Sequence, residues 1–321
     1  MHKKILTLLA VIIMIVFLSA CSDTTQVAEE ISEGELIEEK EEQIVEEVVN
    51  EEQSDAGVEK SDDDESLASE KGEVTVDEQV LLNYEGIIIT LKSLSTDSIW
   101  GPSLRVLVEN NRDEGITVQT RNSSINDVMI ESMFSCDVAA GKKANYEINF
   151  MDTDLEIAQI ETIKDIELSF TIFNSDTWDD IYDSETIYIT TSADESFVQS
   201  YDDSGFVILD QNDFKIVVKK LDSEDSFWGA DIYLYIENNS DKNATIQIRD
   251  TSVNGFMTEP SFSCDVLAGK KAFDSITFLE ADLEENNIES IEELEFYFTI
   301  FESDSWDDIF DSDLIKVSFS D

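Results

Sequence analysis

Two short acidic turns contain the residues of this sequence that could do chemistry. Each turn has four aspartates around a Trp-Asp-Asp core, and the spacing is the same in both. The aspartates are Asp176, Asp179, Asp180 and Asp183 in one turn and Asp304, Asp307, Asp308 and Asp311 in the other. Calcium takes six to eight oxygen ligands, so four carboxylates could supply several of them. One hypothesis is therefore a calcium site in each turn. The alternative is a solvated hairpin loop whose Trp and Ile close the end of a domain.

The sequence offers little to enzyme chemistry. Its single His, His2, lies in the N-terminal segment, and there is no Ser nucleophile elbow and no Cys with a base partner. Carboxylate pairs carry no information in a chain with 74 Asp and Glu against 20 Lys and Arg. We therefore expect no enzymatic activity and no cofactor other than calcium.

The net charge of -54 bears on partners more than on fold. Binding to nucleic acid needs clustered Lys and Arg that displace counterions, so nucleic acid is excluded as a partner. A strongly acidic surface keeps the protein soluble and favours cationic partners, including metal ions.

The N-terminus is typical of a targeting peptide. Basic residues at positions 2–4 precede an apolar run, Ile5–Phe17, and Leu18 followed by the small residues Ser19 and Ala20 then leads to Cys21. This order resembles the lipobox of bacterial lipoproteins, in which the Cys becomes the lipidated first residue of the mature chain. The apolar run is shorter than the ~20 residues that a bilayer requires. We predict a lipoprotein signal peptide over 1–20, lipidation of Cys21, and a lipid-anchored chain at the extracytoplasmic face of the cell membrane.

An acidic segment over 21–80 follows the anchor. It is rich in Glu and Asp, with no aromatic residue before position 80 and few basic residues. Such a segment cannot bury enough apolar surface to offset the entropy lost on ordering, so we predict a disordered, extended linker.

The rest of the chain contains one module twice. Residues 134–144, Phe-Ser-Cys-Asp-Val-Ala-Ala-Gly-Lys-Lys-Ala, recur almost unchanged 128 residues later, and about half of the surrounding positions are identical. Cys136 and Cys264 are equivalent, one in each copy, so neither copy can form an internal disulfide. We interpret both as small buried residues. The Gly141-Lys142-Lys143 turn lacks the spacing of a phosphate loop, and we expect it to expose two solvated Lys side chains.

Short alternating strands dominate each copy. Ile166, Leu168, Phe170 and Ile172 alternate with polar neighbours, as a half-buried strand requires. One helical interval follows Thr153-Asp154-Leu155-Glu156, which fits a capping box, and its counterpart is expected near 282–291. About seven strands and one short helix per copy predict an all-β fold of two tandem β-sandwiches.

The turn Glu237-Asn238-Asn239-Ser240-Asp241-Lys242-Asn243, followed by a strand, resembles the bacterial immunoglobulin-like modules found on Gram-positive surface lipoproteins. The resemblance implies an immunoglobulin-like sandwich and no active site to carry over. The repeat and the polar segment between its copies place the first module at 81–192, a linker at 193–204 and the second module at 205–321.

All four Trp occupy paired positions, Trp100 with Trp228 and Trp178 with Trp306. Strict pairing favours core or end-closing roles, while exposed pairs could stack on sugar or peptide. The combined features predict a membrane-anchored surface lipoprotein with two non-catalytic binding or adhesion modules. Its partner would be a protein, a peptide or a wall polymer. The alternative is a structural spacer that calcium rigidifies through the acidic turns.

Overall fold

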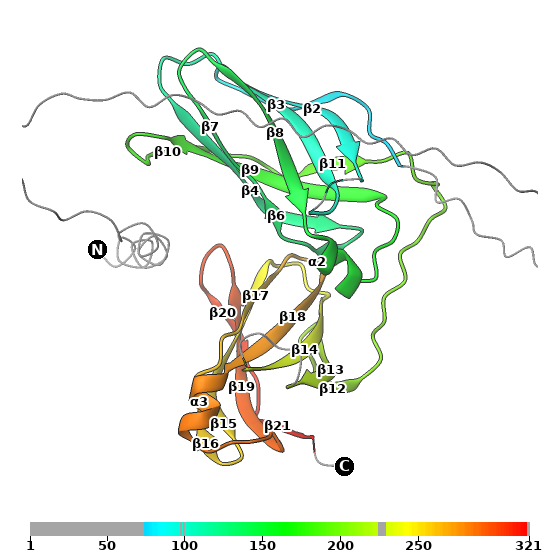
Figure 1. The fold of residues 1–321 in the computed structure, drawn as a ribbon, viewed down its shortest axis with the longest axis vertical. Helices are drawn as coiled ribbons and strands as arrows, with labels where there is room; N and C mark the ends of the chain where they lie inside the picture. The colour runs from blue at the N-terminus through cyan, green and yellow to red at the C-terminus, as the bar shows by residue number, and fades with distance from the viewer. Residues whose placement is uncertain (1–73, 97, 99, 224–228, 320–321) are drawn as a thin grey trace, which may run out of the picture. The chain divides into compact units, whose positions relative to one another are not determined.

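A computed structural model describes residues 74–319 except 97, 99 and 224–228 (Figure 1). The predicted signal peptide, Cys21 and the linker up to residue 73 lie outside the described residues, as does Trp228. Strands form both repeats, with one short helix in each. In the described part of the chain, no helix has the length and apolar character needed to cross a bilayer.

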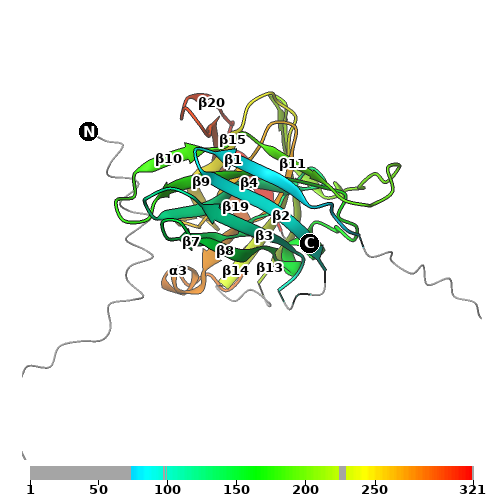
Figure 2. The same cartoon turned by 90° about the horizontal axis from the view of Figure 1, so that it is seen from above.

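The first repeat has an antiparallel sheet with the strand order β1-β2-β3-β8-β6. Figure 2 shows β2, β3 and β8 side by side. The bounds are β1 (Gln79–Tyr84), β2 (Ile87–Ser95), β3 (Ser103–Asn110), β6 (Ser132–Met133) and β8 (Lys143–Phe150).

The second sheet of this repeat is built on the pair β4–β9. The short strands β5 and β7 pair with β4, and β10 and β11 pair with β9. The bounds are β4 (Ile116–Ile125), β5 (Val128–Met129), β7 (Ser135–Val138), β9 (Asp165–Asn174), β10 (Asp180–Asp183) and β11 (Ile187–Thr190), with helix α2 (Asp152–Ile157) between β8 and β9.

This pairing is that of an immunoglobulin-like sandwich. In that fold, strand B pairs with E in one sheet, C pairs with F in the other, and A and G flank B and F. Here β3 pairs with β8 and β4 with β9, while β2 flanks β3, and β10 and β11 flank β9. The predicted all-β, immunoglobulin-like fold is confirmed. Strand β1 is an addition to the strands predicted from the sequence.

The second repeat has the same order of elements. Its first sheet contains β12 (Phe206–Gln211), β13 (Phe214–Asp222), β14 (Gly229–Asn238) and β18 (Lys271–Leu279). Its second sheet contains β15 (Ala244–Val253), β16 (Phe256–Met257), β17 (Ser263–Val266), β19 (Glu293–Glu302), β20 (Asp308–Asp311) and β21 (Ile315–Ser318). Helix α3 (Glu280–Glu285) joins β18 to β19.

Each repeat has its own hydrophobic core, formed by the inward positions of alternating strands. The four apolar residues predicted to alternate in β9 are all fully buried, as are Phe296, Phe298 and Ile300 in β19. Cys136 and Cys264 lie within these cores as free thiols. Burial, followed by the charge of Asp137, raises the pKa of Cys136 to about 11, which disfavours the reactive thiolate.

One fully buried Asn in each repeat holds the turn between the third and fourth strands. The side-chain Nδ2 of Asn110 donates to the carbonyl oxygens of Glu114 (2.8 Å) and Val138 (2.9 Å), and its Oδ1 accepts from the amide of Arg112 at 3.0 Å. Asn238 repeats the arrangement with Lys242, Val266 and Ser240. The Asn-rich turn predicted at 237–243 and its counterpart in the first repeat are therefore each held by hydrogen bonds from a buried Asn side chain.

The predicted capping box is wrong. Helix α2 begins at Asp152, so Thr153 lies inside the first turn, and the residue before the helix, Met151, makes no side-chain cap. The amide of Asp152 instead donates to the carbonyl of Trp100 at 3.1 Å, so contacts with the β2–β3 connection set the start of the helix. In the second repeat α3 begins at Glu280, earlier than predicted, and ends at Glu285.

Candidate functional site

The two acidic turns form the tips of equivalent hairpins, β9–β10 and β19–β20. In the first, the amide of Asn174 donates to the carbonyl of Asp179 at 2.9 Å, and the amide of Trp178 donates to the carbonyl of Asn174 at 2.9 Å. In the second, the amide of Glu302 donates to the carbonyl of Asp307 at 2.9 Å, and the amide of Trp306 donates to the carbonyl of Glu302 at 2.8 Å. The same backbone conformation therefore presents the Trp in both repeats.

The Trp side chains of these turns are exposed, so the predicted core or end-closing role is wrong for them. Trp178 is 70% exposed and Trp306 is 62% exposed. Each ring stacks on a buried Phe of the preceding strand, Phe173 or Phe301, with ring centroids 5.2 Å apart in both repeats. One face of each indole is supported by the core and much of the rest meets solvent. Sequence pairing did indicate a shared role, but it could not distinguish a supported surface ring from a buried one.

The backbone at these Trp residues is strained in the same way. Both have φ of +63°, a left-handed conformation that bulky residues rarely adopt. Such a conformation costs about 1–3 kcal/mol and persists only where the surroundings impose it. Both turns therefore retain an unfavourable conformation that holds an indole at the hairpin tip.

The eight predicted aspartates lie on these hairpins and are all exposed. Asp179 accepts a hydrogen bond from the Thr177 hydroxyl at 2.9 Å, and Asp311 accepts from Arg249 and Thr299 at 3.2 and 2.9 Å. Among the described residues, no group of three or more His, Cys, Asp or Glu side chains is placed to hold a metal ion. Calcium binding at these turns stays a prediction. Ile181 and Ile309, predicted to close the ends of the sandwiches, do pack against the two cores.

A third exposed Trp lies in the β2–β3 connection. Trp100 is 62% exposed, and the next residue, Gly101, has φ of +121°. A Cβ at Gly101 would lie 2.3 Å from the carbonyl oxygen of Phe150, so only Gly fits where this connection crosses the end of β8. Trp100 is therefore a surface residue, contrary to the predicted core or end-closing role.

The two repeats contact each other through β5 of the first and β18 of the second. Lys271 is paired with Val128 in a parallel bridge, and its amide donates to the carbonyl of Asp127 at 2.9 Å. Lys270, only 9% exposed, donates from Nζ to Asp127 Oδ1 at 2.6 Å and to Glu167 Oε1 at 2.5 Å. The two Lys side chains expected to be solvated at Gly141-Lys142-Lys143 are exposed, whereas the other repeat covers the equivalent Lys270.

Burial and charge act in opposite directions on Lys270. Burial disfavours its ammonium ion, but the carboxylates of Asp127 and Glu167 outweigh this effect, so the pKa of Lys270 is raised above its ordinary value. Lys270 is therefore charged at neutral pH, and its ammonium group bridges the carboxylate of Asp127 in the β4–β5 turn and that of Glu167 on β9.

The predicted linker, 193–204, is tied to the first repeat. Lys164 Nζ donates to the carbonyls of Glu195 and Phe197, each at 2.9 Å. The Tyr201 hydroxyl donates to the carbonyl of Asn126 at 2.5 Å. Lys271 lies over the Tyr201 ring, 4.5 Å from its centroid, so the linker also contacts the second repeat.

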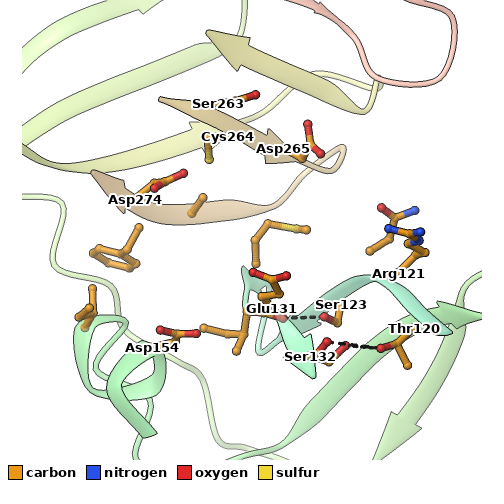
Figure 3. Close-up of a pocket in the computed structure, with 16 residues that line it drawn as sticks. Thr120, Arg121, Ser123, Glu131, Ser132, Asp154, Ser263, Cys264, Asp265 and Asp274 are labelled. Carbon is orange, nitrogen blue, oxygen red and sulfur yellow. Dashed lines mark hydrogen bonds between the residues drawn. The ribbon is translucent and has the colours of Figure 1, made fainter. Parts of the chain in front are cut away.

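A cleft of about 490 Å³ lies beside this contact and is lined by both repeats (Figure 3). Four carboxylic acids surround it, namely Glu131, Asp154, Asp265 and Asp274, together with the thiol of Cys264. Burial raises the pKa of Asp154, of Asp274 and of Cys264. A thiol with a raised pKa is a poor nucleophile, and the cleft residues include no His. The expectation that the chain is not an enzyme stays a prediction.

Comparisons with known proteins do not add a function. No protein-family model matches the chain, and no curated protein matches it. A solved structure of the Salmonella enterica SafA pilin in complex with the SafB chaperone is similar over 67% of this chain and 88% of that chain, at 10% identity and a TM-score of 0.18. A TM-score this low carries no argument about partner or activity.

Proposed function

We propose that this chain is a lipid-anchored bacterial surface protein whose two repeats are non-catalytic binding modules. The lipobox-like sequence ending at Cys21 supports an anchor at the extracytoplasmic face of the membrane. The acidic segment over 21–80 supports a spacer that holds the repeats away from the bilayer. The paired Trp turns support binding, because both repeats present the same supported aromatic ring.

The chemistry around these rings favours a cationic protein or peptide segment as the partner. Trp178 is flanked by the exposed carboxylates of Asp176 and Asp179, and the second turn repeats this arrangement. A Lys or Arg side chain over the free face of an indole gains a cation–π interaction, and the neighbouring carboxylates add charge pairing. The net charge of -54 attracts such a segment over long range. The exposed and stacked Trp in both repeats is the observation that carries this proposal.

Replacing both Trp residues by Ala is expected to weaken binding of a Lys- and Arg-rich peptide by about tenfold or more. Each cation–π contact contributes about 0.5–1 kcal/mol at an exposed site, and two linked sites multiply the effect when one partner spans both. Isothermal titration calorimetry of the W178A/W306A chain at about 0.15 M salt, where weak long-range attraction is screened, measures the change.

Tyr188→Ala is the matched control, because Tyr188 is also 70% exposed but has Lys316 at the equivalent position of the second repeat. Affinity should be unchanged in this variant. Equal loss in the control and in the Trp variant, or no loss in either, would refute a role for the turns. Thermal melts in chelator, in calcium and in magnesium test the alternative of a calcium-responsive spacer. That alternative requires a calcium-specific rise in melting temperature.

Cys21→Ser is expected to move the protein from the membrane fraction to the medium when the chain is produced in a Gram-positive host. The reason is that Ser cannot carry the thioether-linked lipid that the lipobox-like sequence implies. Fractionation followed by immunoblotting measures the distribution. Cys136→Ser, which changes a buried thiol, is the control and should remain with the membrane. Retention of the C21S variant in the membrane fraction would show that another segment anchors the chain.

A further inference from the structure

The contact between the repeats uses one surface of each repeat. The equivalent of each surface is also present on the other repeat, where it is exposed. In the first repeat, β5 pairs with β18 of the second repeat and Met129 packs against the second core, while Val128 is fully buried in the core of its own repeat. The equivalent strand of the second repeat is β16, whose residues Phe256 and Met257 are 49% and 66% exposed. The same structural position is therefore covered in one repeat and open in the other.

The open position is more apolar than the covered one. Phe256 replaces Val128, and Met257 keeps the Met. The adjacent exposed Phe and Met side chains place apolar surface in water, and contact with another protein surface would bury it. Val128 shows what this position of the fold accommodates, since it pairs along a parallel bridge with the turn of another repeat.

The turn that contacts this strand is also present in an exposed form. In the second repeat the covering element is the turn at 268–271, with Lys270 buried. The first repeat has the same turn at 140–143 with the same Gly-Lys-Lys sequence, and here Lys142 is exposed. A single chain thus carries one formed contact, one open β16 surface and one open Lys142 turn.

We propose that a second copy of this chain docks its Lys142 turn onto β16 of the first, reproducing the contact already present between the repeats. The two surfaces are different, so the contact is head-to-tail and can extend from copy to copy into a linear array. Glu295 occupies the position of Glu167 and would receive Lys142, although it now pairs with Lys316.

Two sequence differences between the repeats are expected to make the contact between copies weaker than the contact within the chain. Gly255 replaces Asp127 and removes one of the two carboxylates, and Asn145 replaces Phe273, which packs against the core of the first repeat. The like charge of the two copies also opposes their approach at low salt. Association should therefore depend on concentration and be favoured by crowding on a membrane.

Gly255→Asp restores the missing carboxylate and is expected to tighten self-association by about tenfold, the effect of one well-placed charged hydrogen bond. The turn accepts this change, because Asp127 has φ of +66° where Gly255 has +85°, and a Cβ at Gly255 meets nothing within 4 Å. Sedimentation velocity of the full chain, with detergent micelles in large excess and at about 0.15 M salt, gives the dissociation constant.

Mixing two defective variants tests the head-to-tail geometry. F256S/M257S removes the apolar side chains of β16, and K142E reverses the charge that the turn contributes. Each variant alone is therefore expected to be monomeric. The mixture retains one intact contact, so it should form a one-to-one heterodimer and no larger assembly. Tyr188→Ser, which alters an exposed aromatic elsewhere, should associate like the parent.

Three results would overturn the proposal. The first is a monomer at all concentrations for both the parent and the G255D variant. The second is self-association that survives in either defective variant alone, which would place the contact elsewhere. The third is failure of the mixture to pair although the parent associates, which would indicate a symmetric contact between identical surfaces.

Discussion

Asn110→Ala is expected to lower the free energy of unfolding of the first repeat by about 3 kcal/mol. The substitution leaves the buried carbonyl of Val138 without its side-chain partner, and also the partly buried carbonyl of Glu114 and amide of Arg112. Each unsatisfied buried group costs about 1–3 kcal/mol, and the loss of side-chain volume adds to this. Denaturant unfolding with fluorescence detection measures the change.

The second repeat provides an independent copy of the same experiment. Asn238→Ala should cost a similar amount, because Asn238 is also fully buried and makes the corresponding bonds to Lys242 and Val266. The neighbouring Asn111 is exposed and donates one surface bond to the Gly86 carbonyl at 3.1 Å, so Asn111→Ala should cost less than about 1 kcal/mol. Equal losses in N110A and N111A would contradict the buried-anchor interpretation.

The sandwich architecture was predictable from sequence because strand burial follows a period of two. In β9 and β19 the apolar residues alternate without interruption, and the structure buries them in the predicted positions. The internal repeat added a second observation of each strand. The turn at Asn238 was likewise visible as a cluster of Asn, Ser and Asp, although the inward direction of the Asn238 side chain was not.

The local sequence could not predict features that depend on a neighbouring repeat. Lys142 and Lys270 lie in identical Gly-Lys-Lys-Ala segments, yet one is exposed and the other buried. At another equivalent pair of positions, the residue of the first repeat, Val128, is buried and that of the second repeat, Phe256, is exposed. Exposure of the paired Trp residues was the alternative and not the favoured prediction for a different reason, because a large aromatic residue is usually buried and its position on a hairpin tip comes from a strained backbone.

Lys270→Ala is expected to destabilise the chain by about 2 kcal/mol, while Lys142→Ala, its exact counterpart in sequence, should have almost no effect on dilute protein. Lys270 makes two charged hydrogen bonds, each worth about 1.5–3 kcal/mol, but Asp127 is largely exposed and can be rehydrated, which reduces the total. Thermal melts of both variants beside the parent measure the difference. Equal effects of K142A and K270A would show that the contact between the repeats contributes little to stability.

The pH dependence separates this charge effect from simple loss of packing. The pKa of Lys270 is raised in the folded state above the ordinary value of 10.5, so the folded protein binds this proton more tightly than the unfolded chain. Its stabilising contribution is therefore fully present below pH 10.5 and is lost as the pH rises through the higher folded value. The stability difference between the parent and K270A should stay constant from neutral pH to about pH 10 and narrow above that. A difference that persists unchanged at higher pH would assign the effect to the buried aliphatic part of the side chain, whereas narrowing assigns it to the pairing with Asp127 and Glu167.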